Sequence, residues 1–210
     1  LGVLLALDAQ RSLAHRTAGR VVVGVADDAA PSIATEARAI GALDGTIEVL
    51  IGQDATLERV RRAAQGSSLF HCATHGRFVA ESPLRSGVRL SDGWLTVTDL
   101  FRWRIPGTIV VVSGCDTGRV AVEGGDELTG LQRGFFAAGA SAVVLSAWLA
   151  HDEATVELMC ELHQRTGTDG SMTDTDAQTV GHAGTGRGVV SAIRDAAMAV
   201  RERRPRLVEW

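Results

Sequence analysis

The sequence contains no lysine, asparagine or tyrosine, so all 21 of its basic residues are arginines. We interpret this as a coding bias, and it excludes motifs that require lysine, such as the phosphate-binding loop of nucleotide-dependent enzymes. The chain has only three cysteines, an odd number that argues against a disulfide-stapled secreted scaffold. No apolar run approaches the roughly 20 residues that cross a bilayer, and the opening segment has no basic leader. These absences predict a cytoplasmic protein with no membrane partner.

The composition is that of one globular domain. The 210 residues are 45% hydrophobic and 22% charged, with a formal charge of −4, and a chain of this length buries about 70% of its unfolded surface. The dense basic cluster at 201–206 lies at the C-terminal end, where a solvated helix end accounts for it better than a nucleic-acid footprint does. We predict a single domain over residues 1–210, with no nucleic-acid partner.

Five short apolar runs rich in β-branched residues are apolar at successive positions, which is typical of strands covered on both faces. Helical patterns follow these runs, and the alternation predicts an α/β fold, a three-layer sandwich around a mostly parallel sheet. The predicted strands are 21–26, 47–51, 67–73, 108–113 and 142–148, and the predicted helices are 32–43, 55–64, 128–138, 153–164 and 189–203.

Two segments interrupt this alternation. Turn-forming residues at 76–103 predict a small hairpin attached to the sheet, and residues 166–188 are so rich in Gly, Thr and Asp that we expect a flexible polar surface insertion. At the helix ends, Asp54 is the expected N-cap of the helix at 55–64, and Gly139 is expected to close the helix at 128–138.

The candidate chemistry lies at the ends of two predicted strands, because ligands of open parallel sheets bind outside the carboxyl ends of the strands. The third strand ends in His71–Gly76 and the fourth in Ser113–Gly118. If these strands are neighbours, His75 and Cys115 face each other at one rim. A cysteine attacks as its thiolate, which an imidazole stabilises, and the imidazole can then protonate a departing amine. The backbone N–H groups of Gly76 and Cys115 are the candidate oxyanion hole.

Purely structural roles are also open to these residues. A cysteine at the end of an apolar strand is often a small buried hydrophobe, and a histidine in a strand-end loop is often a surface group. His71, Cys72 and His75 resemble a metal-ligand set in spacing, but on a strand Cys72 points away from the two histidines, so we expect no metal and no other cofactor. Cys160 lies in a helical pattern and is expected in the core.

A more specific signal is a series of short motifs that occur in a fixed order. They are His71-Cys-Ala-Thr-His-Gly76, Ser82-Pro-Leu84 with Ser86-Gly87, Leu95-Thr96 with Asp99-Leu100, Val112-Ser-Gly-Cys-Asp-Thr-Gly118, Gly130-Leu131 with Phe135-Phe-Ala-Ala-Gly-Ala140, and Ser146-Ala-Trp148. This series is similar to that of CHAT domains, the caspase-like modules found with tetratricopeptide repeats and related to separase and the caspases. The resemblance extends over roughly residues 20–165.

The resemblance implies a caspase-hemoglobinase fold and a clan CD cysteine endopeptidase that cleaves a protein or peptide substrate through a His75–Cys115 dyad. It also implies that no third residue is needed to orient His75. Gly114 and Asp116 depart mildly from the usual motif, and the expected lead-in and closing strands are missing. We therefore expect a C-terminal part of a longer protein, with regulation by tetratricopeptide-repeat or sensor domains in the same polypeptide.

Substrate selection rests on fewer residues. Asp116 begins an acidic stretch that includes Glu123, Asp126 and Glu127, which suggests a basic residue before the scissile bond, although the preference for acids at a helix N-terminus accounts for most of them. Ser146 and Trp148 are further candidates for the substrate groove, and Trp148 fits equally well as an aromatic plug between helix and sheet. The alternative function is a catalytically latent CHAT-like scaffold module of a signalling protein.

Overall fold

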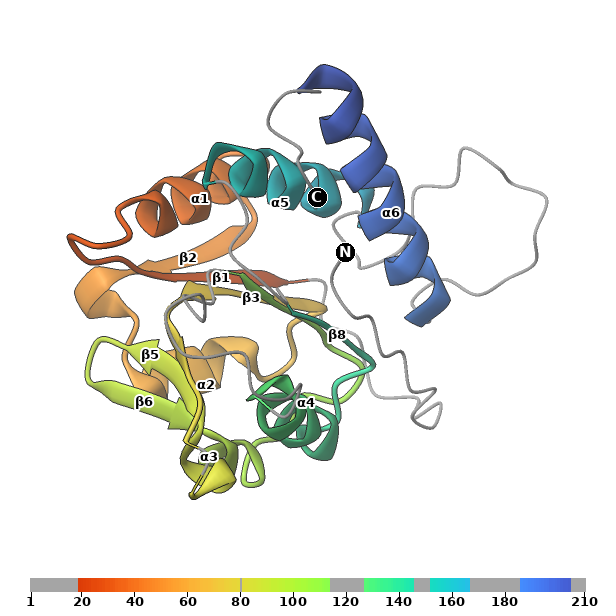
Figure 1. The fold of residues 1–210 in the computed structure, drawn as a ribbon. Coiled ribbons are helices and arrows are strands. Elements are labelled where there is room, and N and C mark those ends of the chain that lie inside the picture. Colours follow the sequence, from red (N-terminus) through yellow and green to blue (C-terminus); the bar gives the residue numbers. More distant parts are fainter. Residues whose placement is uncertain (1–18, 80, 114–126, 146–151, 167–185, 205–210) are drawn as a thin grey trace.

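The computed structural model describes residues 19–79, 81–113, 127–145, 152–166 and 186–204 of the chain. Its centre is a five-stranded sheet in the order β2-β1-β3-β7-β8, with every neighbouring pair parallel (Figure 1). The strands are β1 (Arg20–Val25), β2 (Ile47–Ile51), β3 (Leu69–Thr74), β7 (Ile109–Ser113) and β8 (Ala142–Leu145). The predicted parallel α/β sheet is confirmed. The third and fourth predicted strands, now β3 and β7, are neighbours, which is the condition that the candidate dyad requires.

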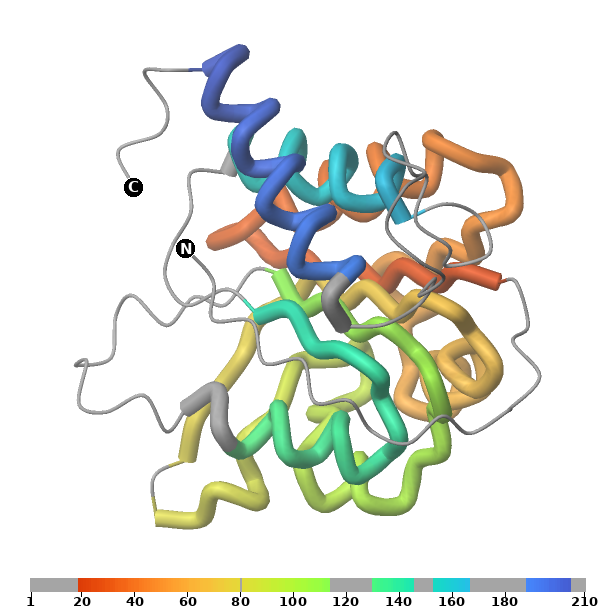
Figure 2. Tube along the Cα trace, turned by 90° about the vertical axis from the view of Figure 1, so that its right-hand side faces the viewer, coloured from red at the N-terminus to blue at the C-terminus, as the bar shows by residue number. Residues whose placement is uncertain are grey.

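Helices cover both faces of the sheet, which makes the three-layer sandwich expected of a caspase-like fold (Figures 1 and 2). Helices α1, α5 and α6 share one buried apolar cluster with one face, and helices α2, α3 and α4 share another with the opposite face. Their bounds are α1 (Ser32–Gly41), α2 (Leu57–Ala64), α3 (Val97–Leu100), α4 (Glu127–Ala138), α5 (Asp152–Arg165) and α6 (Gly186–Arg203).

Residues of the central strands alternate between the two apolar clusters, as the pleat of a strand requires. In β3, Phe70 and Cys72 face α2 and α4, whereas Leu69 faces α1 and α5. The Phe70 ring lies 6.3 Å from the Trp103 ring and 6.4 Å from the Phe135 ring, centroid to centroid. Full burial of one such side chain contributes roughly 1.5–3 kcal/mol, so both faces of β3 anchor it in the middle layer.

A second, antiparallel sheet follows β3. It consists of β4 (Gly76–Arg77), β5 (Gly87–Leu90) and β6 (Gly93–Thr96), in that order, and it matches the hairpin predicted within 76–103. Its inner face is apolar and wholly buried. The Thr96 side chain accepts from the Asp99 backbone N–H while Asp99 accepts from the Thr96 backbone, a capping box that starts α3 directly after β6.

Several predicted boundaries differ from the observed ones. The N-cap predicted at Asp54 is wrong: Thr56 caps α2, while Asp54 closes a short 3-10 turn (Gly52–Asp54) and pairs with Arg59. Gly139 ends α4 as predicted, with a φ of 105° that favours glycine.

The predicted polar insertion is only partly described. Thr166 is buried in the turn that ends α5, and α6 begins at Gly186 rather than at residue 189. Residues 167–185 lie outside the described part of the chain, as do residues 146–148 of the predicted fifth strand. None of the described helices is both long and apolar enough to span a bilayer.

Candidate functional site

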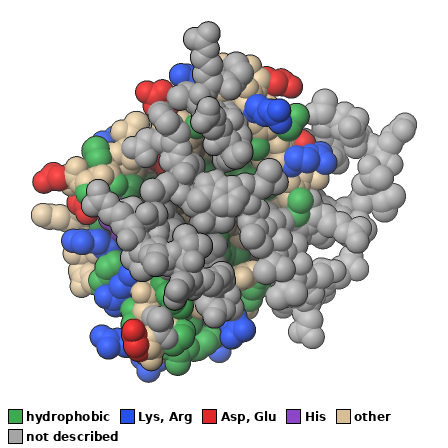
Figure 3. All heavy atoms as spheres, viewed as in Figure 1, with side chains coloured by type: hydrophobic (Ala, Val, Ile, Leu, Met, Phe, Trp, Pro, Cys, Tyr) green, Lys and Arg blue, Asp and Glu red, His purple; other side chains and the backbone are tan. Residues whose placement is uncertain are grey.

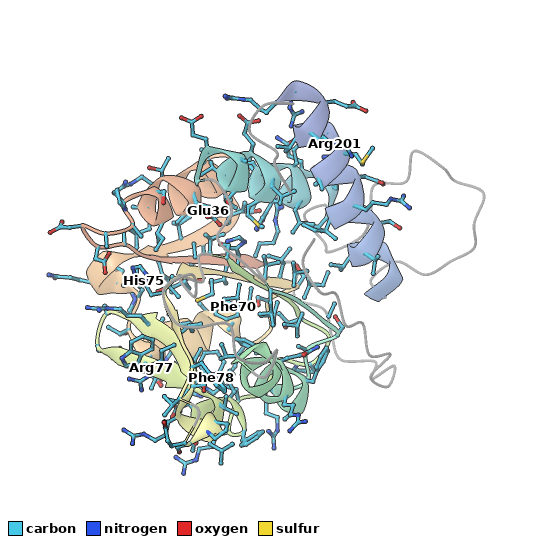
Figure 4. The ribbon with its side chains drawn as sticks, viewed as in Figure 1. Glu36, Phe70, His75, Arg77, Phe78 and Arg201 are labelled. Atoms are coloured by element: carbon cyan, nitrogen blue, oxygen red, sulfur yellow. The ribbon has the colours of Figure 1, made fainter. Side chains whose placement is uncertain are left out.

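The candidate site lies where the order of the parallel strands reverses. From β1 the chain runs to β2 on one side and then returns to β3 on the other side of β1, so the reversal falls between β1 and β3. Ligands of open α/β sheets bind at this position, outside the carboxyl ends of the strands. Asp27 follows β1 and His75 directly follows β3, so their side chains flank the reversal point. Figure 4 shows His75 at this edge of the sheet.

The backbone of His75 is held by β5. The Thr74 hydroxyl donates a hydrogen bond to the Arg89 carbonyl at 2.7 Å, and the Arg89 N–H donates to the His75 carbonyl at 2.8 Å. Opposite residues of an antiparallel ladder are alternately hydrogen-bonded and non-hydrogen-bonded pairs. The second bond shows that Gly76 and Val88 form a non-hydrogen-bonded pair. The N–H of Gly76 is therefore not used between β4 and β5.

The His75 ring contacts a carboxylate. Its Nε2 lies 3.1 Å from Oδ1 of Asp27, with 14% of the histidine side chain and 41% of the aspartate side chain exposed. Nε2 has no hydrogen bond of good geometry within the described residues, so the two groups are close without being aligned. The contact therefore places a carboxylate beside the imidazole ring.

Asp27 is itself fixed by the turn after β1. Its Oδ1 accepts hydrogen bonds from the backbone N–H groups of Ala29 at 3.0 Å and Ala30 at 3.2 Å. The pKa of the Asp27 carboxyl is lowered from its ordinary value, first by the contact with His75 and further by these two N–H groups, while partial burial opposes the shift. The carboxylate is therefore ionised at neutral pH and ready to stabilise a protonated His75.

The structure describes two of the predicted site residues, His75 and Gly76. Cys115, Asp116, Ser146 and Trp148 lie outside the described residues. Strand β7 is described up to Ser113, which pairs with Ala73 of β3, so the described end of β7 and the His75 loop share one edge of the sheet.

A second polar cluster lies under the sheet, on the side covered by α1 and α5. His71 Nε2 lies 2.8 Å from Oε1 of Glu36 and 3.0 Å from the Ser113 hydroxyl, and that hydroxyl donates to the same carboxylate oxygen. All three residues are buried, Glu36 in α1, His71 in β3 and Ser113 at the end of β7. The cluster therefore ties three elements together beneath the candidate site.

The cluster continues into α5. His163 Nε2 lies 3.1 Å from His71 Nδ1, and the buried Arg20 guanidinium donates to the His163 carbonyl at 2.9 Å and to Asp44 at 2.9 Å. Burial, and then the nearby His71 and Arg20, keep the pKa of His163 well below its ordinary value. Two buried side-chain atoms of this cluster, Arg20 Nε and His163 Nδ1, have no hydrogen-bond partner among the described residues.

The two histidines of the sequence motif thus have different environments. His71 is buried against Glu36, whereas His75 faces Asp27 at the rim, and Cys72 belongs to the apolar cluster on the α2 and α4 side. The described residues contain no group of three or more His, Cys, Asp or Glu side chains arranged to hold a metal ion. Cys160, predicted in the core, is half-buried on α5, and burial raises the pKa of its thiol.

Sequence reasoning missed three of the polar residues around the site. Asp27 carries a readable signal, an acid just past a strand that the topology places beside β3. Glu36 and Ser113 carry a weaker one, since a glutamate in an amphipathic helix and a serine ending an apolar strand are ordinary surface and turn residues. Their role depends on α1, β3 and β7 meeting in space.

The geometry agrees with the sequence comparisons. The profile of the CHAT domain family matches residues 4–183, which include Asp27, His75, Cys115 and the whole parallel sheet. No curated protein matches the chain. The CHAT family is related to the caspase-like cysteine peptidases of clan CD. Because the match extends over most of its length, the chain belongs to the CHAT domain family.

Proposed function

We propose that the chain is a cysteine endopeptidase in which His75 and Cys115 form the catalytic dyad. The observation that carries this proposal is the parallel pairing of β3 with β7, in which Ala73 lies opposite Ser113. His75 follows Ala73 by two residues, and Cys115 follows Ser113 by the same number. Two residues of extended chain span about 7 Å at most, so the pairing supports a histidine and a cysteine that share one rim.

The proposed reaction has two stages. The Cys115 thiolate attacks the carbonyl carbon of the scissile amide, and the resulting tetrahedral oxyanion collapses to a thioester as the C–N bond breaks. His75 supplies the proton that the leaving amine needs. Water then hydrolyses the thioester, which releases the acid product, regenerates the Cys115 thiolate and returns a proton to His75.

Two features of the described residues suit this chemistry. The N–H of Gly76 is left out of the β4–β5 ladder, as a donor to the oxyanion must be. Asp27 lies close enough to His75 to stabilise its protonated form, which is the form that acts as the acid. The proposed role of Asp27 is to position and charge His75 rather than to contact the substrate.

The test is cleavage of a mixed peptide library by the full chain, with products identified by mass spectrometry. The wild-type protein should produce new termini, and Cys115→Ala should produce none. His75→Ala should lower the rate by about 100-fold or more, the usual contribution of a general acid.

Cys160→Ala is the matched control, because it removes a thiol of raised pKa on the side of the sheet covered by α1, α5 and α6. Its product profile should equal that of the wild type. A wild-type profile identical to that of Cys115→Ala would reject the peptidase and leave the scaffold module as the function.

A further inference from the structure

The outer face of the small sheet carries positive charge beside His75. In this sheet Val88, Leu90 and Leu95 point inward and are buried. The register places the remaining side chains on the outer face, where Arg77 lies opposite Gly87 and Arg89 lies opposite Trp94. The hydrogen bond from the Arg89 N–H to the His75 carbonyl continues this register, so His75 belongs to the same row as Arg89 and Trp94.

Arg77 is held in a defined position on this face. Its guanidinium carbon lies 4.1 Å from the centre of the Trp94 ring. Strand β5 lies between the two residues. The residue of β5 opposite Arg77 is Gly87, and its lack of a side chain leaves room for the arginine to cross the strand. A guanidinium stacked on an aromatic face is oriented and partly desolvated, while its N–H groups still point outward in its own plane and can donate to a ligand.

Neither arginine is paired with an acid of the described part of the chain. Within the described residues Arg77 and Arg89 take part in no ion pair, and the buried Nε of Arg77 has no acceptor. Arginines elsewhere in the described chain commonly do pair with acids. The paired arginines are Arg20, Arg59, Arg61, Arg62, Arg165, Arg194, Arg203 and Arg204.

Figures 3 and 4 place this charge relative to the candidate site. Several arginine side chains lie at the lower left of the space-filling view, over β5, β6 and α3, and His75 and Arg77 lie on this same side of the molecule. The one carboxylate described beside His75 is that of Asp27, which already pairs with the imidazole. The face therefore presents positive charge that a ligand carboxylate could compensate.

We propose that Arg77, stacked on Trp94 and supported by Arg89, is the subsite for an acidic side chain of the substrate peptide. The proposal rests on the proposed peptidase function. The Arg77 guanidinium lies over Trp94, which is in the same row as His75 with β5 between them. Neighbouring strands are about 4.8 Å apart, so the guanidinium lies roughly 10 Å from His75, and an extended peptide covers that distance in about three residues. A basic side chain there would meet the repulsion of both arginines.

The first arm of the test measures kcat/KM for a matched peptide series that differs at one position near the scissile bond, with Asp, Asn, Leu or Arg. The Asp peptide should be cleaved at least ~10-fold faster than the Asn peptide, because a hydrogen bond to a charged group is lost with the amide. Arg77→Gln should remove that preference, so that this variant cleaves the Asp and Asn peptides at equal rates, and an unchanged circular dichroism spectrum and urea midpoint show that it folds. Arg89→Gln should reduce the preference less.

Arg38→Gln is the matched control, since it removes the same charge from an exposed position on α1, on the opposite side of the sheet. It should leave the series unchanged. Equal cleavage of the Asp and Asn peptides, or faster cleavage of the Arg peptide, would overturn the acidic subsite while the peptidase function stands.

The second arm measures binding without turnover, by fluorescence anisotropy of the Asp and Asn peptides with Cys115→Ala. Tighter binding of the Asp peptide that disappears in Cys115→Ala/Arg77→Gln supports the subsite even if no variant cleaves any peptide, in which case only the peptidase function fails. Equal binding of the two peptides by Cys115→Ala contradicts the subsite.

Discussion

Replacing His71 by leucine tests whether the buried cluster beneath the site stabilises the fold by giving the Glu36 carboxylate its partners. In the native protein the Glu36 carboxylate, whose side chain is 5% exposed, has contacts with the His71 ring and the Ser113 hydroxyl. Leucine fills much of the imidazole volume but donates no hydrogen bond. The variant therefore leaves a buried carboxylate with the serine alone.

The size of the effect follows from this arrangement. Removing the partner of a buried charged group costs about 3–5 kcal/mol, whereas losing one hydrogen bond from an otherwise paired group costs about 1 kcal/mol. We expect His71→Leu to cost about 3–5 kcal/mol and Ser113→Ala about 1 kcal/mol. Since domains are stable by only about 5–15 kcal/mol, the first variant should be strongly destabilised.

Urea unfolding of the full chain at pH 7.5 measures these differences. The decisive variant is the double replacement Glu36→Leu/His71→Leu, which removes the buried charge as well as its partner. It should be more stable than His71→Leu alone, because no uncompensated carboxylate remains. A cost below about 1 kcal/mol for His71→Leu, or a double variant less stable than the single one, would refute the reasoning.

Three further predictions concern other parts of the molecule. The free energy of unfolding should fall as the pH drops below about 6.5, because in the unfolded chain His163 can take up the proton that burial denies it in the folded protein. The slope should be up to ~1.4 kcal/mol per pH unit, and His163→Phe should remove it; urea titrations between pH 7.5 and 5 measure both. Asp27→Asn should lower kcat for peptide cleavage roughly two- to fivefold with little change in KM, whereas an unchanged kcat would remove Asp27 from the mechanism. Gly24→Ala should cost about 1–3 kcal/mol, because a Cβ there would lie 2.6 Å from a side chain of α1, while Gly45→Ala, with open space around it, should be neutral in the same unfolding assay.

Much of the fold could be predicted because the sheet is covered on both faces. Strands such as Arg20–Val25 and Ile109–Ser113 are buried along their whole length, so apart from Arg20 and Ser113 at their ends each appears in the sequence as an apolar run. Helix starts are harder to predict. Asp54 and Thr56 are both good N-cap residues, and the choice between them depends on the 3-10 turn that precedes α2.

The candidate site was predictable where it depends on chain order and not where it depends on packing. His75 could be found because it follows a strand and lies in a motif, and the neighbouring strand β7 leads toward Cys115 in the sequence. The Asp27 contact requires knowing that β1 adjoins β3 on the other side. Contacts of His71 with α1 and of Arg77 with Trp94 join distant segments through side chains, for which the sequence carries no periodic signal.

The most direct test of the central claim is covalent labelling of the full chain with a peptide acyloxymethyl ketone, followed by mapping of the modified cysteine. The account predicts alkylation at Cys115, slowed about 100-fold or more by His75→Ala and unaffected by Cys160→Ala. Labelling at Cys72 or Cys160 instead, or labelling of Cys115 at the same rate without His75, would contradict it.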